Sequence, residues 1–199
     1  MKKALLIGGA LLLLLAWRDW SQREITHPPG ILVPEFPRQS TAGAMGPVQI
    51  GDYRLTPRAS FDLRARVLSV EKYRWGDEAD LSPVDLAMGW GVMSDQSVLD
   101  RITITQGGRW YFTRYEHPAP LSDRQIINNS SNMHMIPANA WVESKLSEIR
   151  KGHIVQAKGF LVDVASDSGF RWFTSLRRDD TGNGSCEIFY VESLYIEES

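Results

Sequence analysis

The sequence predicts an α+β fold that is mainly β, in the form of a small, partly open barrel with inserted short helices, behind an N-terminal transmembrane helix. Three observations support this prediction. An apolar run stands near the start of the chain, alternating apolar and polar residues occupy most of the region after residue 51, and one amphipathic helical pattern precedes the longest alternating segment. Alternation with a period of two is typical of half-buried strands, whereas a period near 3.6 is typical of helices.

The apolar run extends from Ala4 to Trp17 and follows Lys2 and Lys3. As a helix it would be about 21 Å long, against about 30 Å for a bilayer core, which is the length of an export-signal core. Cleavage requires small residues just beyond the run, and bulky or charged residues from Trp17 to Trp20 stand there instead. We therefore predict an uncleaved signal anchor over residues 1–20, with residues 4–17 in the bilayer; a cleaved export signal is the alternative. The two lysines would stay in the cytoplasm and the rest of the chain would be exported.

Residues 21–51 are rich in proline and glycine and show no helical periodicity. Proline fixes φ and lacks an amide donor, so this region is predicted to be an extended linker. The apolar residues Ile31, Leu32, Val33 and Phe36 indicate that part of it docks onto the domain or onto a neighbour.

The folded domain is predicted to span residues 52–199 and to be β-rich. Residues 61–70 form a strand whose apolar phase shifts after Val67, which indicates a bulge. Residues 101–105 and 109–115 alternate around Gln106, Gly107 and Gly108, which predicts a hairpin. Further strands are predicted at residues 153–164, with a bend at Gly159, and at residues 170–175 and 186–196.

Helices are predicted between the strands. Ser82, Pro83 and Asp85 resemble an N-cap, a first helical position and a capping partner, so a short helix is expected over residues 83–88. A longer helix is expected over residues 138–150, and Ser122 with Gln125 would cap a further turn. Five strands, with the long helix before the long bent strand, favour a barrel of the OB type.

Composition excludes several classes of function. The net charge is −2, the pI is about 6.1 and the basic residues are dispersed, so no nucleic-acid partner is predicted. Cys186 is the only cysteine and begins an apolar stretch, which favours structural burial. The four histidines lack ligand spacing and no phosphate-binding glycine loop occurs, so neither a metal nor a cofactor is predicted. Asp180, Thr181 and Gly182 form a polar turn rather than a protease motif.

Four motifs relate the chain to a known group of proteins: residues 89–95 (GWGVMSD), residues 108–111 (GRWY), residues 132–134 (NMH), and residues 180–182 (DTG) with Cys186 and Glu187. In these the chain resembles an uncharacterised family of small, single-span bacterial envelope proteins. The resemblance implies a single-pass protein of the bacterial inner membrane with its C-terminal domain in the periplasm. It implies no activity.

Arginine and aromatic residues are the candidate partner-binding set. Arg109, Tyr111 and Tyr115 share one face of their strand, and Arg171 stands on another strand. With Trp110 and Phe112 on the core side, this face would be exposed, and its composition is typical of recognition surfaces. The alternative is that both faces are core or cross-strand pairs. Trp90, between two glycines, and His134, in a polar stretch interpreted as a loop, complete the set; His134 could equally stabilise that loop.

The sequence thus predicts a membrane-anchored periplasmic domain that is a non-catalytic binding or accessory subunit of an envelope protein complex. It would contact the lipid bilayer and a protein partner, and no catalytic residue is assigned. The alternative is an envelope hydrolase that uses the His134 segment together with a serine and a carboxylate. The candidates for those two roles are Ser130 or Ser131 and Asp95 or Asp180.

Overall fold

The computed structural model describes residues 23–43, 45–182 and 184–198. The predicted membrane segment, residues 1–20, lies outside these ranges. Within them, no helix has both the length and the apolar character needed to cross a bilayer.

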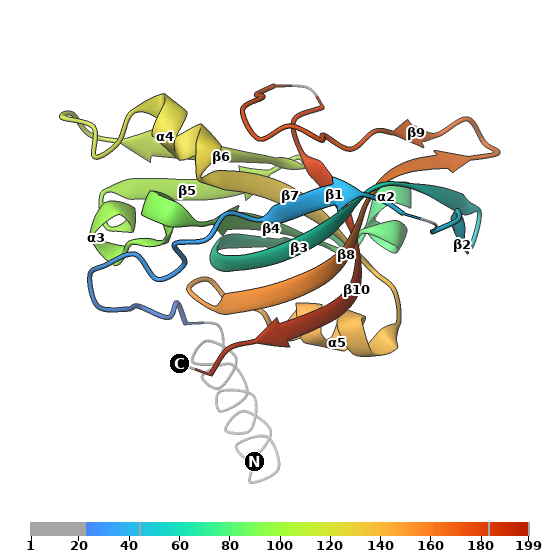
Figure 1. Ribbon diagram of the computed structural model, residues 1–199, viewed down its shortest axis with the longest axis horizontal. Helices are drawn as coiled ribbons and strands as arrows, with labels where there is room; N and C mark the ends of the chain where they lie inside the picture. Colours follow the sequence, from blue (N-terminus) through green and yellow to red (C-terminus); the bar gives the residue numbers. More distant parts are fainter. Residues whose placement is uncertain (1–22, 44, 183, 199) are drawn as a thin grey trace, which may run out of the picture.

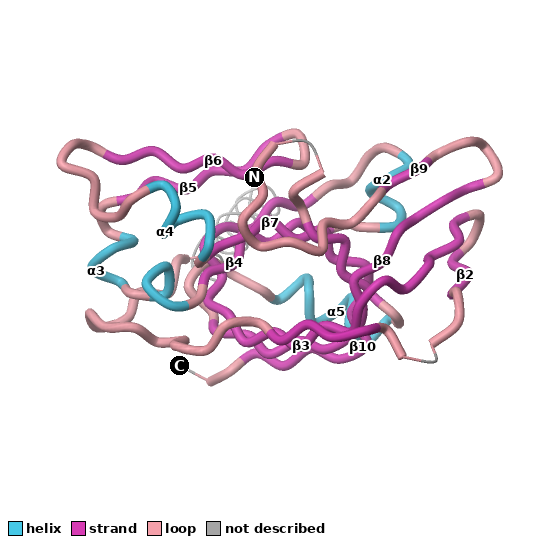
Figure 2. The backbone as a smooth tube through the Cα atoms, turned by 45° about the horizontal axis from the view of Figure 1, so that its top comes forward, coloured by secondary structure: helices cyan, strands magenta, loops and turns pink. Residues whose placement is uncertain are grey.

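The described chain has the predicted α+β, mainly β architecture, and its main sheet closes on itself. Each of five strands pairs with the next, and the fifth pairs back with the first (Figures 1 and 2). All neighbours are antiparallel except β7 and β10, which are parallel. In ring order the strands are β3 (Tyr53–Lys72), β4 (Val84–Gly89), β7 (Ser130–Pro137), β10 (Glu187–Ile196) and β8 (Ile154–Ser166).

Strand β3 shows how the sequence bends the sheet. Its first part pairs with β8 and its last part with β4, and the register with β4 shifts between Val67 and Ser69. Val67 belongs to the core inside the ring, whereas Leu68 belongs to a second cluster outside it. The predicted bulge is therefore confirmed. Gly159 in β8 pairs with Val191 in β10. The register of these two strands shifts directly after this pair, between Val191 and Ser193.

The predicted helix over residues 83–88 is wrong, because these residues form strand β4. All six residues of β4 are buried. Leu86 and Met88 pack inside the ring, while Ala87 packs in the outer cluster. A strand covered on both faces shows no apolar–polar alternation. The sequence of β4 therefore lacks a strand pattern, and the capping pattern of Ser82, Pro83 and Asp85 led to the prediction of a helix. The short helix lies earlier, at α2 (Asp77–Leu81).

The other two predicted helices are confirmed. Helix α5 (Ala140–Glu148) begins after Asn139, whose side chain accepts a 3.0 Å hydrogen bond from the Val142 amide. It packs Val142 and Leu146 into the core inside the ring. Helix α4 (Asp123–Asn128) begins with the predicted Ser122 and Gln125 capping box. A 3-10 helix, η1 (Gly91–Ser94), and helix α3 (Gln96–Leu99) follow β4.

The predicted hairpin consists of β5 (Ile102–Gly107) and β6 (Trp110–Tyr115), which form a sheet of their own beside the ring (Figure 1). Its turn is centred on Gly108 and Arg109, slightly later than predicted, and Arg109 has a φ of 69°. Of the strand predicted over residues 170–175, only β9 (Arg171–Trp172) is regular, and it pairs with β8.

The proline-rich segment belongs to the folded unit. Strands β1 (Arg38–Thr41) and β2 (Val48–Ile50) both pair with β3. Upstream of them, Ser94 Oγ accepts hydrogen bonds of 3.1 and 3.0 Å from the amides of Leu32 and Val33. Val33 is completely buried in the core. Leu32 and Val33 therefore dock onto the chain's own domain, whereas Ile31 and Phe36 are 49% and 54% exposed.

Candidate functional site

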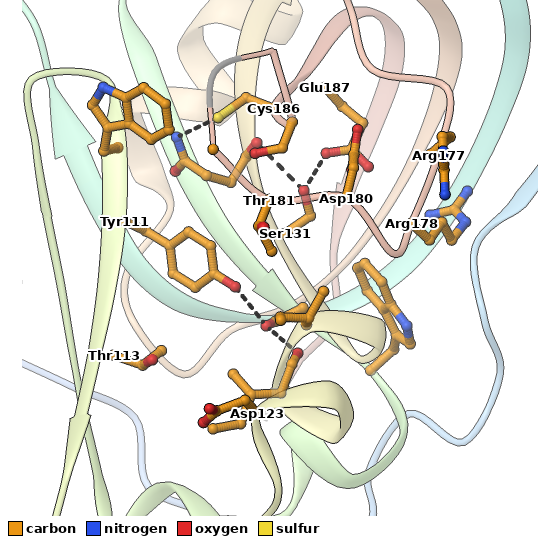
Figure 3. Close-up of a pocket in the computed structure, with 18 residues that line it drawn as sticks. Tyr111, Thr113, Asp123, Ser131, Arg177, Arg178, Asp180, Thr181, Cys186 and Glu187 are labelled. Atoms are coloured by element: carbon orange, nitrogen blue, oxygen red, sulfur yellow. Dashed lines mark hydrogen bonds between the residues drawn. The ribbon is translucent and has the colours of Figure 1, made fainter.

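A pocket of about 310 Å³ opens between the hairpin, α4, the start of β7 and the loop that leads into β10 (Figure 3). The loop supplies Arg177, Arg178, Asp180 and Cys186, and β10 begins with Glu187. The opposite walls carry aromatic and hydroxyl side chains. These are Trp90, Trp110, Tyr111, Ser130 and Ser131.

Glu187 is the most unusual group in the pocket. Its side chain lines the cavity, yet the residue is only 3% exposed. Burial raises the pKa of its carboxyl to about 7, against the opposing effects of a hydrogen bond donated by Ser131 and of the nearby Arg178 charge. Near neutral pH this carboxyl therefore exists in both the protonated and the ionised form.

Arg178 also lies in the wall of the pocket, next to Arg177 (Figure 3), and its charge acts on the Glu187 carboxyl. Its guanidinium carbon lies 4.9 Å from the ring centroid of Phe61 and 5.7 Å from that of Trp90. Among the described residues its buried Nη1 finds no hydrogen-bond acceptor. A buried guanidinium N–H without a partner is costly, so Arg178 retains unused donor capacity in the pocket wall.

In the wall formed by β6, α4 and β7, hydrogen bonds link two hydroxyl groups to a backbone carbonyl. The Tyr111 hydroxyl lies 2.9 Å from Ser130 Oγ, which in turn donates to the Ile126 carbonyl over 2.7 Å. Burial raises the pKa of the Cys186 thiol to about 11, so this cysteine is a neutral thiol at physiological pH. The residue is half-buried in the pocket wall, and a neutral thiol is a poor nucleophile.

Of the six predicted partner-binding residues, Trp90 and Tyr111 line the pocket, and Arg109, Tyr115, Arg171 and His134 lie outside its lining. Trp90 lies in the connection between β4 and η1 and is only 1% exposed. Tyr115 is half-buried and donates a hydrogen bond to Asp123. Arg171 is exposed, as expected, and donates hydrogen bonds to the Ser166 and Phe170 carbonyls.

The expected orientation of the hairpin is also reversed. Trp110 and Phe112, taken as core residues, are 36% and 57% exposed. Tyr111 instead packs against the outer cluster of apolar residues, and the Arg109 side chain is only 14% exposed. Alternation in β6 correctly separates two faces. Which face is buried depends on the hairpin's position over the ring, and alternation does not reveal this.

His134 lies in the central strand β7 rather than in a loop, and it is 2% exposed. Its Nδ1 lies 2.9 Å from Oδ1 of the fully buried Asp85, though outside hydrogen-bonding geometry. Its ring centroid is 4.5 Å from that of Trp172. The polar residues of this strand point outward from the ring, under the hairpin, and so escape the apolar core.

The predicted hydrolase constellation does not assemble. Ser130, Ser131 and Asp180 line the pocket, whereas His134 contacts Asp85 outside the pocket lining. Asp95 lies at the docked N-terminal segment, where it accepts a hydrogen bond from the Gly30 amide. In the described part of the chain, no group of three or more His, Cys, Asp or Glu residues is placed to hold a metal ion.

Sequence reasoning missed Glu187 and Arg178. The available signal for Glu187 was a carboxylate at the start of an apolar strand, next to Cys186. Arg178 is adjacent to the equally charged but exposed Arg177, and nothing in the local sequence distinguishes the two.

Comparison with protein families, with curated proteins and with solved structures finds no match for this chain. Its function is therefore argued from the residues and from the geometry of the pocket.

Proposed function

We propose that this chain is a membrane-anchored, periplasmic binding module, a non-catalytic or accessory subunit of a bacterial envelope complex, and that the pocket receives a side chain of its protein partner. The observation that carries the proposal is the unpartnered Nη1 of Arg178 in the wall of an open pocket. It calls for an oxygen acceptor, such as a carboxylate or an amide carbonyl.

The surroundings of Arg178 support a protein partner. Trp110, Tyr111 and Arg177 line the same pocket, and Leu176, next to Arg177 in the chain, is 40% exposed. Tryptophan, tyrosine and arginine dominate the binding energy of protein interfaces, especially where a pocket excludes water from them. A cavity of about 310 Å³ has room for an inserted side chain and lies at the lower end of the size range of ligand pockets.

The position of the pocket in the fold gives further support. The ring order β3–β4–β7–β10–β8, with α5 between β7 and β8 in the sequence, is compatible with an OB-like barrel. OB barrels bind ligands over their second and third strands and the neighbouring loops. Here the pocket lies at the start of the third strand, β7, between the inserted hairpin and the loop before β10. This support is by analogy of fold.

The membrane and periplasmic parts of the proposal rest on sequence. They are supported by the apolar run Ala4–Trp17, by the basic residues before it and by the resemblance to single-span envelope proteins.

The test compares Arg178 with an exposed arginine outside the pocket lining. The full chain, purified from detergent-solubilised membranes as Arg178→Gln, is expected to lose its specific co-purifying partner at least tenfold. Arg54→Gln, with the same chemistry at an exposed position that does not line the pocket, should retain that partner. A folded Arg178→Gln variant that keeps its partner would overturn the proposal. If Arg178→Gln does not fold, Trp110→Ala at the half-exposed rim replaces it as the decisive variant.

An envelope hydrolase remains the second candidate, now centred on Glu187 rather than on His134. The observation in its favour is that Glu187 and Asp180 share the pocket, and that a carboxyl with a pKa of about 7 can donate or accept a proton near neutral pH. Turnover of an envelope ester or glycoside that is abolished in Glu187→Gln would favour this candidate over the binding module.

A further inference from the structure

One edge of the domain combines exposed aromatic side chains with exposed or half-buried basic ones. We call it the α5 face: Trp141, Lys145, Arg150, Lys151 and Tyr195. Trp141 and Tyr195 are 56% and 57% exposed, and both line a groove between α5 and the end of β10. Lys145 and Arg150 line the same groove. Tryptophan and tyrosine with long basic side chains are the residues that prefer the interface between lipid and water.

The N-terminal segment joins the domain at this same edge. The Ile25 amide donates a 2.9 Å hydrogen bond to the Lys151 carbonyl, and Lys151 Nζ lies 2.9 Å from a carboxylate oxygen of Glu24. His27 Nε2 lies 2.7 Å from the Gly152 carbonyl. The loop that receives the chain is therefore next in sequence to Arg150, in the groove.

The chain between this loop and the predicted anchor is short. Residues 18–22 separate Trp17 from Arg23. Fully extended, this connection reaches about 20 Å, at about 3.5 Å per residue. If Ala4–Trp17 lies in a bilayer, Arg23 must lie within that distance of the membrane surface. The loop at Lys151, which binds Ile25, must then lie within about 28 Å of it. The α5 face adjoins this loop and is therefore within reach of the lipid.

We propose that the α5 face binds the interfacial layer of the bilayer that anchors the chain, with Trp141 and Tyr195 among the lipid headgroups. This inference rests on the membrane anchor of the proposed function. Lys145 is paired with Glu148, and Lys151 with Glu24, so the aromatic pair supplies most of the attraction. Arg150 makes no ion pair with the described residues and is available for an anionic headgroup.

This orientation has a consequence for the pocket. Figure 1 places α5 and the end of β10 at one edge of the domain, and the hairpin and α4, which line the pocket, at the opposite edge. With the α5 face on the lipid, the pocket faces away from the membrane, where a periplasmic partner can reach it.

The test uses the full chain in vesicles of phosphatidylcholine and phosphatidylglycerol. In a Cys186→Ser background, Trp141→Cys carries an environment-sensitive fluorophore. Phe112→Cys, at an aromatic residue of nearly equal exposure on the hairpin, is the matched control. We expect blue-shifted emission from position 141 and at least threefold stronger quenching there than at position 112 by nitroxide-labelled lipid.

The outcomes separate the two proposals. If the chain sediments with vesicles but positions 141 and 112 are quenched equally, the α5 face does not bind lipid, while the anchor stands. If the chain does not sediment with vesicles, both the anchor and this inference fail. Circular dichroism confirms folding of each variant, and Tyr195→Cys replaces Trp141→Cys if the latter does not fold.

Discussion

Arg109 at the tip of the hairpin reaches down to Asp85 in the central strand β4: its Nη1 lies 2.7 Å from Oδ1 of a carboxylate that is completely buried. The same nitrogen donates to the Ser82 carbonyl over 3.0 Å, and the guanidinium carbon lies 3.8 Å from the ring centroid of Tyr73. The hairpin forms one wall of the pocket, so this ion pair positions the pocket without lining it.

The ion pair predicts a large effect of Arg109→Ala. The substitution leaves Asp85 buried without its cation, which costs about 3 to 5 kcal/mol of unfolding free energy. Urea denaturation measures the loss. Arg114→Ala, exposed on the same hairpin, should change stability by less than about 0.5 kcal/mol. Equal effects of the two substitutions would contradict the role of the ion pair.

Gly159 permits the closest approach of β8 to β10. A Cβ atom at this position would lie 2.0 Å from the Tyr190 carbonyl oxygen. Gly159→Ala is therefore expected to destabilise the barrel by about 3 kcal/mol or more, because backbone must move to relieve the clash. Gly107→Ala is the control, since its Cβ would meet nothing within 4 Å. Thermal melting of both variants checks the prediction, which a mild effect at Gly159 would refute.

The raised pKa of Glu187 predicts that the free energy of unfolding falls as the pH rises. Its carboxyl has a folded-state pKa of about 7 against an ordinary value of 4.5, so between these values the folded state holds a proton that the unfolded state has released. The contribution is fully present below about pH 4.5 and is lost as the pH approaches 7, by on the order of 3 kcal/mol. Urea denaturation of the wild type and of Glu187→Gln at pH 5 and pH 8 isolates this effect. Parallel profiles for the two proteins would mean that Glu187 is not the group responsible.

The hydrogen bonds that Ser94 accepts from Leu32 and Val33 are expected to help hold the N-terminal segment on the domain. Ser94→Ala removes the acceptor of the Leu32 and Val33 amides, at a cost of about 1 to 3 kcal/mol. We expect faster amide hydrogen exchange over residues 25–33, while the ring strands keep their protection. Ser144→Ala, on the exposed side of α5, should leave exchange in this segment unchanged. Unaltered exchange in Ser94→Ala would show that Val33 burial alone holds the segment.

The local elements of the fold were predictable because their signals lie within a few residues of one another. The capping box of Ser122 and Gln125, the apolar stripe of α5 and the glycine-centred turn of the hairpin each depend on contacts between near neighbours. The phase shift at Val67 and Leu68 was readable for the same reason, since each side chain meets a different core.

The sequence by itself determined the mainly β class, most strand positions and the separation of two faces along β6. Tertiary structure decided which of those faces is buried, because this depends on the hairpin folding over β4 and β7. Because the hairpin covers the outer face of β4, this strand is buried on both faces. Its sequence therefore lacks the apolar–polar alternation that would have identified it as a strand. The pocket could not be predicted from the sequence for a related reason. Ser131 and Glu187 are 56 residues apart in the chain, and only the parallel pairing of β7 with β10 brings them together.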